Sequence, residues 1–139
     1  MAVRNATAEW QGNLKEGNGT VGFGSFEANY SFASRFEEGE GTNPEELLGA
    51  AHAGCFSMAL SNSLANEGYN PKRVHTTARV HLVKKDGKNT ITRIDLTVEG
   101  EVEGIDEETF KQFAEDTKEN CIVSRALNVD EMNVDAKLV

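Results

Sequence analysis

The chain has 139 residues, of which 38% are hydrophobic, and its 14 basic and 23 acidic residues give a formal net charge of −9 at pH 7. This length predicts one domain over residues 1–139, because chains divide into several domains only beyond roughly 250 residues. The negative charge repels phosphate backbones and anionic lipids, so we expect no binding to nucleic acid or to a membrane surface.

The first forty residues are expected to form a small β meander. They carry three strand-like pieces separated by Gly and Asn: residues 7–11, 20–23 and 29–34. The spacing Gly17-x-Gly19-x-x-Gly22 also matches a dinucleotide-binding pattern, which has meaning only between a strand and a helix. Because strand-like residues surround these glycines, we interpret them as a hairpin turn.

A long helix should come next. Asn43 is a favoured N-cap residue, Pro44 suits the first helical position and Glu46 stands three residues after the cap. The helix should run to about residue 67, where Gly68 can adopt the left-handed C-cap conformation. Its apolar residues surround it on nearly every side, which predicts a buried helix at the centre of the structure. Several of them are small and would let another element approach closely: Ala50, Ala51, Ala53, Gly54 and Ala59.

Two alternating runs predict a hairpin after this helix. Apolar side chains alternate with polar ones over residues 73–83 and again over residues 92–98. Asp86-Gly87 supplies turn chemistry between the runs, so they should pair as antiparallel strands.

A second helix and a last strand should follow. Asp106 is placed to cap the helix, Ile105 and Phe110 can form a hydrophobic staple, and Asn120 can end it. The final run, residues 132–139, alternates and should return to the sheet. We therefore predict an α+β fold, with antiparallel sheets, a long buried central helix and a second helix.

The apolar segments are too short to cross a membrane. The longest apolar-rich run, residues 47–60, is interrupted by Gly, His and Ser, whereas a spanning helix needs roughly 20 apolar residues. The first ten residues lack the continuous hydrophobic stretch of a secretory signal. We therefore expect a cytoplasmic protein, in which two cysteines are more often reactive or inert than a structural disulfide.

The histidines and cysteines do not form a recognisable metal site. His52 and Cys55 stand three residues apart, but no C-x-x-C or H-x-x-x-H pair completes four ligands. No Asp or Asn motif supports His52 as the base of a cysteine hydrolase, so we interpret it as a partly buried polar group or a neighbour of Cys55. From position alone, Cys55 is as readily a small core residue as a reactive thiol, and Cys121 by itself is interpreted as a packing residue.

Three segments of the chain form recognisable motifs: YSFASRF at residues 30–36, GTNPEELLGAAHAGCFSMAL at residues 41–60 and C-x-V-S at residues 121–124. Together they resemble the OsmC/Ohr family of thiol-dependent peroxidases, and most closely the branch named after osmotically inducible protein C. The likeness reaches from Ala8 to the last strand and covers nearly the whole chain. The family usually has Pro directly after the second cysteine, where this chain has Ile122, and Asn120 replaces a common Gly.

The resemblance implies a peroxidase that reduces organic hydroperoxides and hydrogen peroxide without a bound cofactor, as an intertwined homodimer. It implies that Cys55 attacks the peroxide and becomes a sulfenic acid, with which Cys121 condenses to form a disulfide. Arg35 and Glu45 would complete the site. An external dithiol, such as a lipoylated protein, would reduce the disulfide.

Each of these roles has a physical reason. A free thiol has a pKa of about 8.5 and burial raises it, so an adjacent cation is required to hold Cys55 as a thiolate. Arg35 keeps its proton, and its guanidinium can also stabilise charge on the leaving oxygen. Glu45 would hold Arg35 through a bidentate pair. Without the resemblance, a surface arginine and a first-turn acid favoured by the helix dipole are the plainer interpretations.

Spacing along the long helix predicts a site built from two chains. Glu45 and Cys55 are ten residues apart, which is roughly 15 Å along a continuous helix. Either the helix breaks between them, or Glu45 and Arg35 reach Cys55 from a second copy. The absence of an internal Pro and the small helix residues favour the second copy.

A different class of function remains as an alternative. A redox-sensing or small-ligand binding module would keep the same fold and turn over poorly, and Ile122 is the feature that would favour it. The sequence does not rank organic hydroperoxides against hydrogen peroxide, and it does not identify the reductant.

Overall fold

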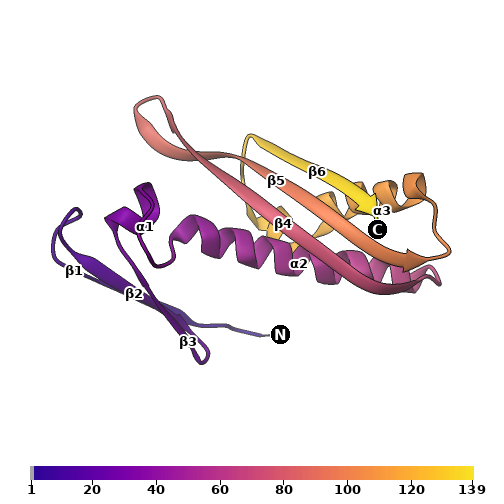
Figure 1. Ribbon diagram of the computed structural model, residues 1–139, viewed down its shortest axis with the longest axis horizontal. Helices are drawn as coiled ribbons and strands as arrows, with labels where there is room; N and C mark the ends of the chain where they lie inside the picture. Colours follow the sequence, from indigo (N-terminus) through magenta and orange to yellow (C-terminus); the bar gives the residue numbers. More distant parts are fainter. Residues whose placement is uncertain (1) are drawn as a thin grey trace. The chain divides into compact units, whose positions relative to one another are not determined.

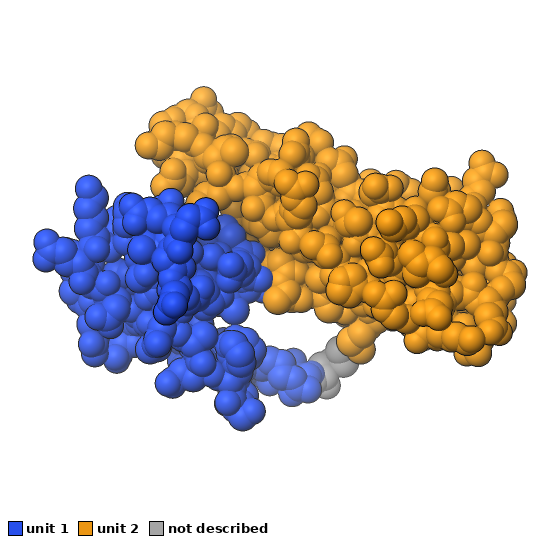
Figure 2. Space-filling view, in the orientation of Figure 1, with its two compact units in different colours: residues 1–47 blue, residues 48–139 orange. Residues whose placement is uncertain are grey.

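A computed structural model describes residues 2–139. The chain divides into two compact units near the start of its longest helix, one formed by residues up to Leu47 and the other by residues 48–139 (Figure 2). Among the described residues, no helix combines the length and the apolar composition that crossing a membrane requires.

The first unit contains the expected β meander. Strands β1 (Ala6–Gln11), β2 (Asn18–Phe23) and β3 (Phe26–Tyr30) form an antiparallel sheet in that order (Figure 1). Of the three spaced glycines, only Gly17 lies in the β1–β2 hairpin loop, while Gly19 and Gly22 lie inside β2. A Cβ on Gly19 would lie 2.5 Å from a Tyr30 ring carbon and 2.7 Å from a Trp10 ring carbon, so this glycine lets two aromatic rings pack on the strand.

A short helix replaces the end of the third expected strand. The strand prediction for residues 29–34 is wrong after Tyr30, because α1 (Phe32–Phe36) begins there. Ser31 and Ser34 form a reciprocal capping box: the Ser34 amide donates to Ser31 Oγ at 3.1 Å, and the Ser31 amide donates to Ser34 Oγ at 2.8 Å. These two bonds satisfy amide donors that a helix start otherwise leaves free.

The long helix α2 (Pro44–Asn66) has the predicted ends. The Glu46 amide donates to Asn43 Oδ1 at 2.8 Å, which confirms the N-cap, and Gly68 after the helix has a φ of +89°. The prediction that α2 is buried on nearly every side is wrong for the single chain. One stripe of residues four apart is fully buried: His52, Phe56, Leu60 and Leu64. The other side carries exposed small residues and Met58, which is 76% exposed.

The second unit is a three-stranded sheet with helices packed on one face. Strands β4 (Asn70–Lys85) and β5 (Lys88–Glu103) form the predicted antiparallel hairpin, with positive φ at Asp86 and Gly87 in the turn. The buried face of β5 packs with the apolar stripe of α2 and with Phe110 of α3 (Glu107–Asn120) through Ile94, Leu96 and Val98.

The last strand corrects the expectation of purely antiparallel sheets. Strand β6 (Glu131–Leu138) joins β5 in parallel, giving the order β4-β5-β6. A crossover through α3 and α4 (Ile122–Ala126) connects the two strands, and such a helical connection returns the chain in its original direction (Figure 1). The α+β class is confirmed.

Candidate active site

The two cysteines meet in the second unit. Cys55 lies on α2, and Cys121 lies between α3 and α4, where its amide donates to the Thr117 carbonyl at 2.8 Å and its carbonyl accepts the Arg125 amide at 3.0 Å. Both are free thiols, and a hydrogen bond joins their Sγ atoms at 3.0 Å. A disulfide has an S–S distance of about 2.05 Å, so a movement of about 1 Å would join them.

Exposure distinguishes the two thiols. Cys121 is 1% exposed, whereas Cys55 is only half-buried. A small solute from water can therefore reach the Cys55 sulfur more readily than the Cys121 sulfur.

The surroundings of the sulfurs also distinguish their acidities. Burial raises the pKa of Cys55, and its contact with Cys121 raises it further. The backbone amides of Val123 and Ile122 lower this pKa, but by less. For Cys121, burial alone would raise the pKa, but the neighbouring Cys55 thiol and the polar groups of Ser124 and Val123 together lower it. The second unit by itself therefore favours a thiolate at Cys121 over one at Cys55.

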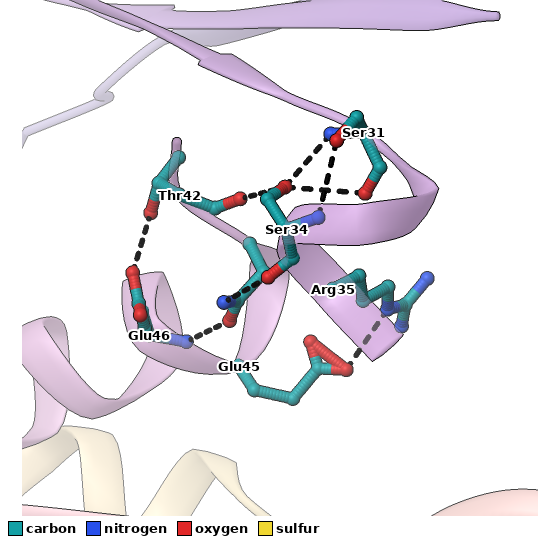
Figure 3. A network of polar contacts seen from close by, with 7 residues as sticks. Ser31, Ser34, Arg35, Thr42, Glu45 and Glu46 are labelled. Atoms are coloured by element: carbon teal, nitrogen blue, oxygen red, sulfur yellow. Dashed lines mark hydrogen bonds and ion pairs between the residues drawn. The ribbon is translucent and has the colours of Figure 1, made fainter. Parts of the chain in front are cut away.

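The predicted cation and its acid meet in the first unit. Arg35 Nε donates to Glu45 Oε1 at 2.9 Å, joining α1 to the first turn of α2 (Figure 3). The contact is one hydrogen bond, not the bidentate pair that we expected. Glu45 is 8% exposed, and its Oε2 has no hydrogen-bond partner within residues 2–139. The guanidinium of Arg35 also lies over the ring of Phe36, with its Cζ 5.3 Å from the ring centroid.

A polar network fixes α1 against the start of α2. Ser34 Oγ donates to the Thr42 carbonyl at 2.6 Å, and Asn43 Nδ2 donates to the Ser34 carbonyl at 3.0 Å (Figure 3). Both bonds involve the residue directly before Arg35. They hold Arg35 beside Glu45 without relying on the ion pair alone.

A cavity of about 430 Å³ opens beside Arg35 in the first unit. Its wall is mainly aromatic and aliphatic, with Trp10, Leu14, Tyr30, Phe32 and Phe36 among its lining residues. An apolar wall next to one cation suits a ligand that has a hydrocarbon part and a polar end.

His52 is more deeply placed than its sequence position suggested. It is fully buried, and a hydrogen bond of 2.7 Å joins its Nε2 to Ser124 Oγ, 72 residues further along the chain. Burial lowers the pKa of His52, so the ring is neutral at pH 7. Sequence reasoning missed Ser124 as a site residue, although it closes the C-x-V-S motif that starts at Cys121.

The four predicted site residues thus form two pairs, Arg35 with Glu45 and Cys55 with Cys121. In the part of the chain that the structure describes, no three His, Cys, Asp or Glu side chains gather where they could share a metal ion.

Known proteins are similar to this chain over much of its length. A family model described as "OsmC-like protein" matches residues 37–137. The chain is 46% identical over 130 residues to Peroxiredoxin OsmC of Escherichia coli strain K12, covering 91% of both proteins. It is 27% identical over 94 residues to Organic hydroperoxide resistance protein-like 2 of Staphylococcus epidermidis, covering 66% of both.

Solved structures show a similar fold. The Organic Hydroperoxide Resistance Protein OhrB of Bacillus subtilis has a TM-score of 0.73 at 24% identity, over 99% of this chain and 100% of that one. An OsmC-like protein of unknown function from Vibrio cholerae has a TM-score of 0.77 at 18% identity, over 98% of this chain and 99% of that one.

Proposed function

The chain belongs to the OsmC family, and from this membership we propose that it reduces organic hydroperoxides and hydrogen peroxide as a thiol-dependent peroxidase. The observation that carries the proposal is the pair of free thiols 3.0 Å apart, of which Cys55 is the accessible one.

The chemistry uses the two sulfurs in turn. The Cys55 thiolate attacks one peroxide oxygen, the O–O bond breaks, and the leaving alkoxide takes up a proton to give an alcohol and a Cys55 sulfenic acid. Cys121 then attacks the Cys55 sulfur, which gives a disulfide and water and protects Cys55 from over-oxidation. An external dithiol, such as a lipoylated protein, reduces the disulfide. The cytoplasmic location of the protein stays a prediction.

Arg35 and Glu45 supply what the cysteine pair lacks. Because the surroundings of Cys55 in its own unit raise its pKa, the attacking thiolate needs a nearby positive charge. Arg35 carries a permanent charge, and its contact with Glu45 uses one of its five N–H donors. The remaining donors suit the developing charge on the leaving oxygen.

A second copy of the chain would complete the site. Helix α2 is continuous from Pro44 to Asn66, so Glu45 and Cys55 are separated by roughly 15 Å along its axis. The exposed side of α2, with small residues and Met58, offers a surface for a partner helix. We propose an intertwined homodimer in which Arg35 and Glu45 of one chain serve Cys55 of the other, each chain forming one domain.

The cavity beside Arg35 supports an organic substrate. Its aromatic lining would hold the hydrocarbon part of a hydroperoxide, while Arg35 faces the peroxide group. Hydrogen peroxide would gain nothing from this wall, so the proposal favours organic hydroperoxides.

A redox sensor on the same fold remains the alternative. Ile122 was expected to favour it, yet the Ile122 amide lowers the pKa of Cys55, which is the direction that catalysis requires. Hydroperoxide consumption with excess dithiol separates the two functions. A peroxidase consumes many equivalents per chain, with Cys55→Ser inactive, and a single stoichiometric oxidation of the wild type would contradict the proposal.

A further inference from the structure

The ion pair with Glu45 is too weak to fix Arg35 in place by itself. The side chain of Arg35 is 39% exposed, and an ion pair that solvent reaches contributes little to holding two side chains together. Helix α1, which carries Arg35, has only five residues, and a helix of this length is not stable in water without tertiary contacts. The position of Arg35 relative to Glu45 therefore depends on the contacts that other parts of the chain make with α1.

The peptide group between Ser34 and Arg35 is held at both ends. Its carbonyl, on Ser34, accepts a hydrogen bond from Asn43 Nδ2 at 3.0 Å, and its amide, on Arg35, donates to the Ser31 carbonyl at 3.1 Å. The last carbonyls of a helix have no partner within it, so Asn43 supplies one that α1 lacks. The Ser34 hydroxyl adds a second connection by donating to the Thr42 carbonyl at 2.6 Å. These bonds fix the backbone from which the Arg35 side chain extends.

Asn43 joins this peptide group to the other half of the ion pair. The two ends of its amide group bond to different helices: Nδ2 donates to the Ser34 carbonyl of α1, and Oδ1 accepts the Glu46 amide of α2 at 2.8 Å. Glu46 directly follows Glu45 in the first turn of α2. Capping a helix needs only the acceptor oxygen, and Asp or Ser caps as well as Asn does. The Nδ2 donor therefore has a role that is separate from the cap.

We propose that Asn43 is a positioning residue for Arg35, in which one amide group sets the arginine-bearing helix against the turn that carries Glu45. This inference rests on the proposed peroxidase function, because the position of Arg35 affects the rate through the charge that it brings to Cys55. A guanidinium that is displaced by about 1 Å keeps its charge but loses its alignment with the reacting atoms, and such misplacement slows a reaction.

Variants that keep the cap and remove the amide donor separate positioning from helix stability. Asn43→Ser and Asn43→Asp both leave an oxygen to accept the Glu46 amide, and neither has an amide N–H to donate. Each should lower the second-order rate of Cys55 oxidation roughly three- to tenfold, the equivalent of one hydrogen bond. Asn13→Ser is the matched control, because Asn13 Oδ1 accepts the Glu16 amide at 2.7 Å in the same way, but in the β1–β2 loop. It should keep the wild-type rate.

A double-mutant cycle tests whether Asn43 acts through Arg35. Adding Asn43→Ser to Arg35→Ala should cost no further rate, and the pH dependence of Cys55 alkylation should move upward in Asn43→Ser, as in Arg35→Ala. Asn43→Ala also removes the cap, so it should unfold at a lower urea concentration than Asn43→Ser. Additive losses in the cycle, a wild-type rate in both Asn43→Ser and Asn43→Asp, or rates that simply follow the urea midpoints of the variants would overturn the inference.

A measurement without peroxide keeps this inference separate from the proposed function. The Nε–H group of Arg35 gives its own signal in heteronuclear NMR, which is assigned by its disappearance in Arg35→Lys. Because this N–H donates to Glu45 at 2.9 Å, its exchange with water should be slow in the wild type and roughly threefold or more faster in Asn43→Ser. Equal exchange in the two chains would count against the inference. Failure of the wild type to consume hydroperoxide would instead defeat the proposed function.

Discussion

The Sγ atoms of Cys55 and Cys121 lie 3.0 Å apart, although 66 residues separate the two cysteines in the chain. The packing that joins them also makes them unequal, since Cys121 is buried and Cys55 is half-buried. Two sulfurs in contact but with different access to solvent are suited to successive steps of one reaction.

The two cysteine variants should therefore fail differently. With limiting hydroperoxide and no reductant, Cys121→Ser should accumulate a dimedone-reactive sulfenic acid at Cys55, because the attack succeeds and the resolving sulfur is missing. Cys55→Ser should consume no peroxide. Mass spectrometry of the dimedone adduct and a peroxide assay measure the two outcomes. Wild-type turnover in Cys55→Ser would show that Cys55 is not the cysteine that attacks the peroxide.

Arg35→Ala should lower the second-order rate of Cys55 oxidation by roughly a hundredfold, because it removes both the cation near the thiolate and a donor to the leaving oxygen. Arg35→Lys should recover only part of this rate, since an ammonium lacks the guanidinium's planar set of donors. The pH dependence of Cys55 alkylation should move upward in Arg35→Ala. Arg79→Ala, at an exposed strand position, is the control. Equal rates and titrations in Arg35→Ala and Arg79→Ala would leave Arg35 without a role.

The proposed exchange of residues between copies predicts complementation. A Cys55→Ser chain and an Arg35→Ala chain, each inactive alone, should give up to one intact site per heterodimer after co-refolding. The measurement is peroxide turnover of heterodimers isolated by two affinity tags. Inactive verified heterodimers, or a fully active monomer in analytical ultracentrifugation, would contradict the two-copy site.

Ile122→Pro should weaken the thiolate at Cys55. Ile122 is the first residue of α4, a position that accepts Pro, and the ψ of 133° at Cys121 is compatible with a following Pro. The substitution removes the amide whose hydrogen bond lowers the pKa of Cys55. Oxidation of Cys55 at neutral pH should slow, by less than in Arg35→Ala, and should recover as the pH is raised. Ile122→Val keeps the amide and should match the wild type; an unaltered Cys55 titration in Ile122→Pro would refute the role of the amide.

His52 should make stability fall in mild acid. Because burial lowers its pKa in the folded chain, the unfolded chain binds more protons below about pH 6.5, so the free energy of unfolding decreases as the pH falls from there. Urea titrations at a series of pH values should show this decrease in the wild type and a smaller one in His52→Gln. His75→Gln, on an exposed strand position, should keep the wild-type slope. The same slope in all three chains would exclude His52 as its cause.

The sequence by itself determined the features that depend on near neighbours. The cap at Asn43, the end at Gly68 and the Asp86-Gly87 turn each involve residues within a few positions of one another, so their signals can be read locally. The motif around Cys55 was likewise contiguous. The capping box of Ser31 and Ser34 is equally local, and we missed it because the surrounding residues alternate like a strand.

Only the tertiary structure decided which distant side chains meet. The contact of Cys55 with Cys121 and the bond of His52 to Ser124 depend on how α2, α3 and α4 pack, and the parallel pairing of β6 depends on the crossover that these helices make. No local pattern encodes such contacts, because they are set by the burial of the apolar stripe on α2 against β5 and Phe110. Tertiary packing also determines that the opposite side of α2 is exposed, because one sheet can cover only one face of a helix.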